Sequence, residues 1–356
     1  MALGACVAMG IFSLFIPYLY NYVKCKSFQI SERDSITFEA LKPISSTQSF
    51  CIALYDFLTP MQLSESAVYN SKQISTEMPD IVLLYIGEAY RADHSPLNGY
   101  KRNTMPSISN EKNIINLPNV HSRATQTLSS IYSILTLTSP ETGKATHNSF
   151  LNILKKHNYK NYLLVGANTG GRWYLTPGIA QLFQNQILLH SRPKSPEEYK
   201  SAINSIVCEA SPVFVLIEDG AGHQPYHSEN YTFGVATEID KYDNCLIDVD
   251  SRVFALINEL RDKSAILFFT SDHGESFGEG GRYGHAGPIS AREQTHVCSF
   301  IWYSDKYAEA NPEIIKNLKI NADVFVSHDY IYHTIISMSG IWSKIQIKNQ
   351  DMTLAQ

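Results

Sequence analysis

The chain has 356 residues, enough to bury an extensive core and to form one large domain or two ordinary ones. Its 29 Lys and Arg residues against 34 Asp and Glu residues give a net charge of −5, and no basic run stands out, so a nucleic-acid partner is not expected. The composition, 44% hydrophobic and 18% charged, excludes a disordered chain.

The chain begins with an apolar segment. Residues 2–23 carry no charged side chain over about the 20 residues that span a bilayer. Aromatic and basic residues of the kind that collect at a membrane surface end the segment: Tyr18, Tyr20, Tyr22, Lys24 and Lys26. Because it lacks a basic start and a small-residue cleavage site, a transmembrane helix (residues 1–23) is favoured over a signal peptide. The two lysines favour a cytoplasmic position for the following domain, a weak tendency for one segment.

A regular alternation of elements begins after a polar stretch, residues 24–78, which is interpreted as a linker with an amphipathic portion. Apolar runs predict strands over residues 80–88, 161–168, 212–220, 264–274 and 296–305, and helices over residues 125–138 and 243–262. Strands that alternate with helices indicate an α/β fold, here an α/β/α sandwich with a mostly parallel central sheet. We expect this domain to occupy residues 79–345, followed by a tail, residues 346–356.

Polar side chains follow four of the predicted strands, where each strand ends. These residues are Glu88, then Asn168, then Glu218, Asp219 and His223, and finally Asp272 and His273. Because the carboxyl ends of parallel strands meet at one edge of a sheet, we expect these side chains to lie close together. Their convergence predicts a functional site at that edge.

The pair Asp272 and His273, with Glu88, offers carboxylate oxygens and an imidazole nitrogen, a donor set typical of a catalytic zinc site. Gly274 is expected to permit the turn that brings both neighbours to one ion. The alternative is that Asp272 caps the next helix and His273 lies in a surface loop. Magnesium or manganese would suit the carboxylates, but histidine favours zinc.

Several hydroxyl groups lie at the start of the helix predicted over residues 125–138. They belong to Ser122, Thr125, Thr127, Ser129 and Ser130. A helix N-terminus stabilises a phosphoryl anion, and a metal ion lowers the pKa of a hydroxyl group that attacks phosphorus. The residues alone leave the choice among the five open, and N-capping is the alternative role for each.

Four blocks of sequence resemble one family. They are "YIGEAYRADHSPLNGYKRNTMPSIS" (85–109), "SRATQTLSSIYS" (122–133), "YDNCLIDVD" (242–250) and "TSDHGESFGEGGRYGHAG" (270–287). Together and in this order they resemble the phosphoethanolamine transferases that modify lipid A and other envelope glycans, members of the alkaline phosphatase and sulfatase superfamily.

The resemblance implies a role for eight residues. Glu88, Thr127, Asp272 and His273 would ligate a catalytic Zn²⁺, with Thr127 as the nucleophile. His223, His285, Asn168 and Arg172 would bind the substrate, with arginine at 172 where the family usually has lysine. The number of zinc ions used during turnover stays open.

The chain departs from the family in two respects. Arg123 and Leu137 stand near positions where relatives carry cysteines, and the six cysteines here form no C-x-x-C pair or zinc-finger spacing. Relatives also carry several membrane spans before the catalytic domain. The chain is therefore expected to be either a single-span relative or one that lacks upstream spans.

The resemblance implies transfer of phosphoethanolamine from phosphatidylethanolamine to lipid A, lipopolysaccharide core or another glycan, through a phosphothreonine. It also implies a bacterial inner-membrane protein whose catalytic domain faces the periplasm. Alternatives are a hydrolase of the same superfamily, a polymerase of the teichoic acid type and a non-catalytic envelope binding protein. The C/S-x-P-x-R block of sulfatases does not precede the helix.

Overall fold

The computed structural model describes residues 71–75, 77–138, 145–166, 183, 185–189, 195–209, 212–343 and 354–355. The predicted transmembrane segment and most of the predicted linker lie outside these ranges. Among the residues described, the structure contains no helix long and apolar enough to cross a membrane.

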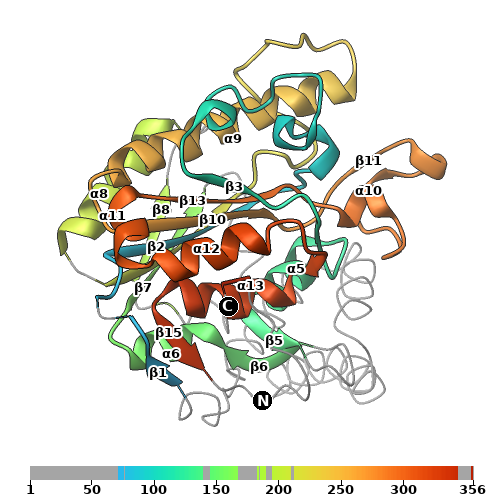
Figure 1. Ribbon diagram of the computed structural model, residues 1–356. Coiled ribbons are helices and arrows are strands. Elements are labelled where there is room, and N and C mark those ends of the chain that lie inside the picture. The colour runs from blue at the N-terminus through green and yellow to red at the C-terminus, as the bar shows by residue number, and fades with distance from the viewer. Residues whose placement is uncertain are drawn as a thin grey trace, which may run out of the picture. The chain divides into compact units, whose positions relative to one another are not determined.

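The centre of the domain is a seven-stranded mixed sheet (Figure 1). In spatial order its strands are β3 (Ile114–Asn116), β13 (Ser299–Tyr303), β10 (Ala265–Ser271), β2 (Ile81–Gly87), β9 (Val213–Asp219), β7 (Lys160–Gly166) and β8 (Asn185–Leu189). The five strands from β10 to β8 run parallel, as predicted. β13 runs antiparallel to both neighbours. β13 starts beside the C-terminal end of β10, where the Ser271 N–H donates to the Cys298 carbonyl. Because the chain does not first cross back to the N-terminal end of β10, β13 runs in the opposite direction.

Both faces of the sheet are buried, and alternate side chains of β2 enter two separate cores. Val82, Leu84 and Ile86 pack with residues of α5 (Thr127–Leu135), α6 (Phe150–Lys156) and α13 (Asp329–Met338). Ile81, Leu83 and Tyr85 pack with residues of α8 (Pro196–Glu209) and α9 (Glu238–Leu260) on the other side. This alternation follows from the two-residue period of a strand. The helices therefore cover both faces, as expected for an α/β/α sandwich (Figure 1).

Two predicted helices have different bounds. α9 begins at Glu238, not at residue 243, because Thr237 and Asp240 form a capping box in which each side chain accepts the other residue's backbone N–H. α5 ends at Leu135, and the β-branched Thr136 and Thr138 belong to β5 (Thr136–Thr138), which pairs with β6 (Ala145–Ser149).

Parts of the predicted linker and tail belong to the folded domain. Within the linker, β1 (Ser71–Gln73) pairs with β15 (Ile341–Ser343). Within the tail, Leu354 and Ala355 are buried in a core.

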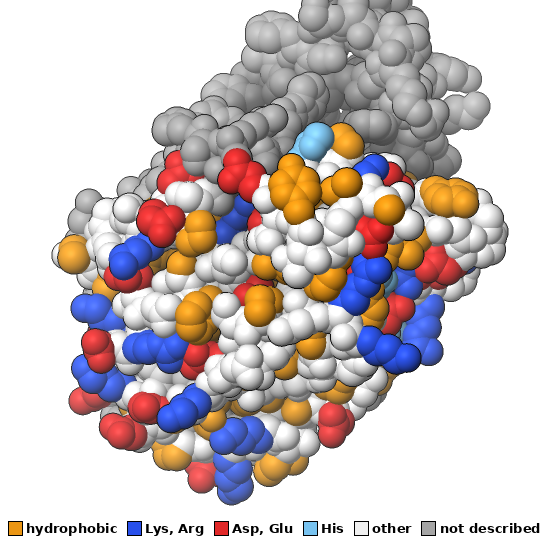
Figure 2. All heavy atoms as spheres, turned by 90° about the horizontal axis from the view of Figure 1, so that it is seen from above, with side chains coloured by type: hydrophobic (Ala, Val, Ile, Leu, Met, Phe, Trp, Pro, Cys, Tyr) orange, Lys and Arg blue, Asp and Glu red, His pale blue; other side chains and the backbone are white. Residues whose placement is uncertain are grey.

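The remaining elements are short and lie in connections. They are η1 (Ala92–His94), η2 (Pro96–Asn98), η3 (Ile108–Asn110), β4 (Val120–His121), β11 (Ser276–Phe277), η4 (Glu279–Gly281), β12 (Tyr283–Gly284), α10 (Arg292–Thr295), α11 (Asp305–Ala310), α12 (Pro312–Ile320) and β14 (Val326–Ser327). Figure 2 shows acidic and basic side chains interspersed with apolar ones over the described surface seen from above.

A buried ion pair joins the end of β9 to α9. Arg252 Nη1 donates to both carboxylate oxygens of Asp219, at 3.0 and 2.9 Å, and Tyr85 donates its hydroxyl to the same carboxylate. The side chains of Arg252 and Asp219 are 5% and 1% exposed. Asp219, predicted to contribute to the site at the sheet edge, is instead part of this structural pair.

Replacing Arg252 with methionine should destabilise the domain by about 3–5 kcal/mol, because the Asp219 carboxylate would stay buried without its cation. Equilibrium unfolding in urea measures the loss. Lys316→Met is the matched control, since Lys316 pairs with Glu313 on the exposed face of α12. A loss no larger than that of the control would contradict the structural role of the pair.

Replacing Gly222 with alanine should also destabilise the domain. An added Cβ would lie 2.1 Å from the backbone oxygen of Glu88, so the loop after β9 and the turn after β2 could not both keep their positions. We expect a cost of about 2 kcal/mol or more. Gly99→Ala is the comparison, because it has no neighbour within 4 Å of an added Cβ and reports only the strain of an alanine at a φ of 89°. A Gly222→Ala variant that unfolds in urea at the wild-type concentration would show that the close approach is unimportant.

Candidate active site

The register of two parallel strands brings the predicted acidic residues together. Ser271 of β10 is paired with Gly87 of β2, so Asp272 and Glu88 leave the sheet side by side. The backbone N–H of Asp272 donates to the Gly87 carbonyl at 3.0 Å. Ala89 adopts a positive φ of 58° immediately afterwards, and this turn directs Glu88 toward the edge of the sheet.

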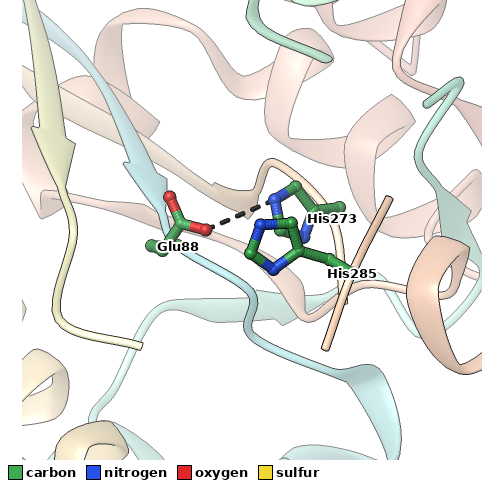
Figure 3. A group of neighbouring side chains, drawn as sticks. All are labelled: Glu88, His273 and His285. Carbon is green, nitrogen blue, oxygen red and sulfur yellow. Dashed lines mark ion pairs between the residues drawn. The ribbon is translucent and has the colours of Figure 1, made fainter. Parts of the chain in front are cut away.

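Glu88, Thr127, Asp272 and His273, predicted from distant parts of the sequence, lie in one buried cluster. Thr127 Oγ1 is 3.3 Å from Glu88 Oε2 and 3.2 Å from His273 Nε2. His273 Nε2 is 3.3 Å from Glu88 Oε1 and 3.3 Å from Asp272 Oδ2. Figure 3 shows the Glu88 carboxylate directed at the His273 ring.

The cluster fits a divalent cation. Glu88 Oε1 and Asp272 Oδ2 are buried and have no hydrogen-bond partner. His273 Nδ1–H donates to the Gly274 carbonyl at 2.9 Å, so Nε2 faces the two carboxylates and is the nitrogen available to a metal ion. Unpaired carboxylate oxygens are costly to bury unless a cation or proton joins them. Carboxylate, imidazole and hydroxyl donors are suited to zinc.

The pKa values of the three ionisable groups reflect the same demand for positive charge. Burial opposes the charged form of His273, but the charge of Asp272 and the contacts with Glu88 raise its pKa to about 10. Burial and then the charge of Glu88 raise the pKa of Asp272 to about 6. Burial would raise the pKa of Glu88, but the close contact with His273 and the charge of its ring lower it to about 2. In the metal-free protein a proton on His273 therefore takes the place of a cation.

The predicted substrate-side histidines lie next to this cluster. The His285 ring is 4.6 Å from the His273 ring and 5.3 Å from the His223 ring, centroid to centroid. Ligand atoms of Glu88, His273 and His285 lie within 4.8 Å of one another. The side chain of His285 is 24% exposed, so it lies at the mouth of the site. Asn168 and Arg172 lie outside the described residues.

The structure distinguishes among the hydroxyl groups that the sequence left open. Thr127 is the first residue of α5, where backbone N–H groups are free of helical partners. Ser122 donates to the Ala124 carbonyl and Thr125 donates to the Gly287 carbonyl, both at 2.7 Å. Ser130 Oγ lies 3.0 Å from Ser122 Oγ. Thr127 is therefore the hydroxyl that faces both Glu88 and His273.

Two features of the site differ from the expectation. Gly274 does not adopt a positive φ; it is needed because an added Cβ would lie 2.2 Å from the Glu293 backbone oxygen. Glu275, to which the sequence gave no role of its own, is fully buried, and its Oε2 lies 3.1 Å from His285 Nδ1. The sequence shows that Glu275 lies close to Asp272 and His273 along the chain. No spacing rule, however, predicts its contact with His285, ten residues later.

Comparisons with known proteins agree with this architecture. In sequence the chain is 28% identical over 296 residues to the Kdo(2)-lipid A phosphoethanolamine 7''-transferase of Escherichia coli K12, covering 74% of this chain and 52% of that protein. The chain thus spans about half the length of this curated relative.

In structure, the chain is similar to the soluble domain of lipooligosaccharide phosphoethanolamine transferase A from Neisseria meningitidis. The TM-score is 0.69 at 22% identity, covering 84% of this chain and 98% of that one. It is also similar to the C-terminal periplasmic domain of EcEptC from Escherichia coli in complex with Zn, with a TM-score of 0.68 at 19% identity, covering 81% and 89%. At these identities the likeness concerns the fold.

The model of the sulfatase family matches residues 80–341. This range includes the whole central sheet and the cluster of Glu88, Thr127, Asp272 and His273. The chain therefore belongs to the sulfatase family.

Proposed function

We propose that this chain is a zinc-dependent phosphoethanolamine transferase that moves phosphoethanolamine from phosphatidylethanolamine to lipid A, lipopolysaccharide core or another envelope glycan. The observation that carries the proposal is the contact of the Thr127 hydroxyl with Glu88 and His273, beside two buried carboxylate oxygens that lack partners. The name of the Escherichia coli relative supports the transferred group and the lipid A acceptor. The protein would act at the bacterial inner membrane with this domain in the periplasm.

Glu88, Asp272, His273 and Thr127 would hold the zinc ion. When bound, zinc would supply a positive charge that lowers the pKa of a hydroxyl group and balances the charge of a phosphoryl group. The protein contributes the orientation: His273 is fixed by its bond to the Gly274 carbonyl, and Asp272 Oδ1 accepts the backbone N–H groups of Ala89 and His273 at 3.0 and 2.7 Å.

In the first step Thr127 Oγ1 attacks the phosphorus atom of the donor, and the bond from phosphorus to the diacylglycerol oxygen breaks. Overall, the proton of the threonine hydroxyl replaces phosphorus on the diacylglycerol oxygen, and phosphoethanolamine is left on Thr127. In the second step an acceptor hydroxyl or phosphate takes the group and returns a proton to Thr127. The free N–H groups at the start of α5 favour the phosphoryl charge throughout.

His223, His285, Asn168 and Arg172 are proposed to hold the phosphoryl oxygens and the head group. His285 is suited to this, because Glu275 lies against its Nδ1 while the ring stacks at an angle beside His273. A hydrogen bond between Nδ1 and a carboxylate orients an imidazole ring and directs Nε2 toward the site.

A hydrolase is the second candidate, favoured by the match to the sulfatase family. A phosphothreonine could react with water in place of an acceptor. The two functions differ in their products, which are free phosphoethanolamine for a hydrolase and a modified lipid or glycan for a transferase. A non-catalytic binding protein is less consistent with the chain, because the Thr127 hydroxyl at the start of α5 contacts Glu88 and His273, groups that suit a metal ion.

Replacing Thr127 with alanine should lower transfer by at least about a thousandfold, because the attacking oxygen is removed. Mass spectrometry of the intact protein after incubation with phosphatidylethanolamine should show added phosphoethanolamine on the wild type and none on the variant. Thr127→Ser keeps a hydroxyl and should keep measurable transfer and labelling. Full labelling of Thr127→Ala would refute the assigned nucleophile, and release of free phosphoethanolamine as the sole product would favour the hydrolase.

Replacing Asp272 with asparagine should have opposite effects on the metal-free and the zinc-loaded protein. Without metal the variant should be as stable as the wild type or more stable, because the repulsion between the buried carboxylates of Glu88 and Asp272 is removed. With zinc the variant should gain much less stability, because a ligand is lost.

Thermal unfolding with chelator and with zinc, together with elemental analysis, measures both effects. Glu313→Gln on α12 is the control, since Glu313 is exposed and pairs with Lys316. A variant that keeps the full stabilisation by zinc would exclude Asp272 as a ligand.

A further inference from the structure

His328 is a fully buried histidine to which neither the sequence nor the proposed mechanism gives a role. It lies at the start of α13, outside the ligand cluster, and its Nε2 is 3.1 Å from the carbonyl oxygen of Ser271. A carbonyl oxygen only accepts, so Nε2 carries the proton and donates. Nδ1 is buried without a hydrogen-bond partner, and burial lowers the pKa of the ring to about 3, so the ring is neutral.

Ser271 is the residue that His328 holds, and it immediately precedes Asp272 and His273. Its hydroxyl lies 3.0 Å from the Gly87 carbonyl and 3.0 Å from the His273 carbonyl, and it accepts the Tyr90 N–H at 2.6 Å. Its N–H donates to the Cys298 carbonyl at 3.1 Å. Ser271 thus links the turn after β2 to the turn after β10. Its remaining polar group, the carbonyl, accepts from His328 and, at 3.2 Å, from the Thr270 hydroxyl.

The segment that carries His328 is itself tied to the chain that leads into Thr127. β14 pairs with β4, and the backbone N–H of His328 donates to the His121 carbonyl at 3.0 Å. Two residues after His121, Arg123 forms an ion pair with Asp329 at 3.1 Å. His328 therefore contacts the segment before Thr127 through its backbone and the segment before Asp272 through its side chain.

We propose that His328 is a positioning residue of the metal centre. Its Nε2–H bond to the Ser271 carbonyl fixes the position of the Asp272–His273 turn relative to the start of α5. This inference rests on the proposed zinc site. Loss of the bond would leave every ligand in place, but the Ser271 carbonyl would keep only the Thr270 hydroxyl as a donor, at 3.2 Å, and the turn would be free to shift. Direct partners of metal ligands are worth about 10–100-fold in metal affinity, and His328 acts through the residue that precedes two ligands, so we expect an effect at the lower end of this range.

The test compares zinc affinity of the full chain and its variants by titration against a competing chromophoric chelator. His328→Leu removes the donor at similar volume and should raise the Kd for zinc by about tenfold. His328→Gln places an amide nitrogen near the position of Nε2 and should restore the Kd to within about threefold of the wild type. Thr334→Val is the matched control, because it removes a buried hydroxyl of α13 that donates to the Tyr330 carbonyl and accepts the Leu354 N–H, and it should leave the Kd unchanged.

Urea unfolding with chelator present separates a loss of stability from a loss of affinity. If His328→Leu does not fold, His328→Asn replaces it; its amide is too short to reach Ser271, so the same weakening is expected. Wild-type affinity in His328→Leu, or in the substituted asparagine variant, would overturn the inference and leave the proposed function intact. A wild-type chain that binds no zinc would overturn the proposed function and this inference together.

Discussion

The structure depends on the pairing of β2 with β10 in a register that places Gly87 opposite Ser271. The residue after each of these positions is acidic, so Glu88 and Asp272 are buried close to one another. Two like charges in a poorly solvated environment repel, and each loses its hydration. The site is therefore stable only when a positive charge lies between them, and a proton on His273 or a divalent cation meets that requirement.

The surrounding residues form hydrogen bonds with one oxygen of each carboxylate and not with the other. One oxygen of each carboxylate is occupied: Asp272 Oδ1 accepts two backbone N–H groups, and Glu88 Oε2 accepts from Thr127. The other oxygen of each lacks a hydrogen bond. The occupied oxygens fix the orientation of the side chains, and the free oxygens are available to a cation. The two unpaired oxygens lower the folding stability of the domain, but they are already in position to bind a cation.

Local sequence signals predicted the strands and helices that build the site, but not all of their limits and directions. The apolar run at residues 80–88 predicted β2 to within one residue at each end, because a strand buried on both faces has few polar positions. The run at residues 264–274 began within one residue of β10 but extended three residues past its end. The start of α9 depended on the capping pair Thr237 and Asp240, which was overlooked. The direction of β13 depended on the path of the chain after Asp272, which apolar periodicity does not encode. Asp219 lies at the end of a strand, as Glu88 does, and was therefore expected at the site. It instead forms a buried ion pair with Arg252, which comes from a helix distant in sequence.

The sequence by itself determined which groups are available for chemistry: the carboxylates and imidazole of Glu88, Asp272 and His273, the hydroxyls at the start of a helix, and the resemblance carried by four ordered blocks. These are properties of residue type and of short-range order along the chain. Only the tertiary structure decided which hydroxyl faces the carboxylates, which carboxylate oxygens remain free, that Glu275 orients His285, and that His328 reaches Ser271. Each of these depends on atoms brought within about 3 Å by strand register and helix packing, which residue order alone does not specify.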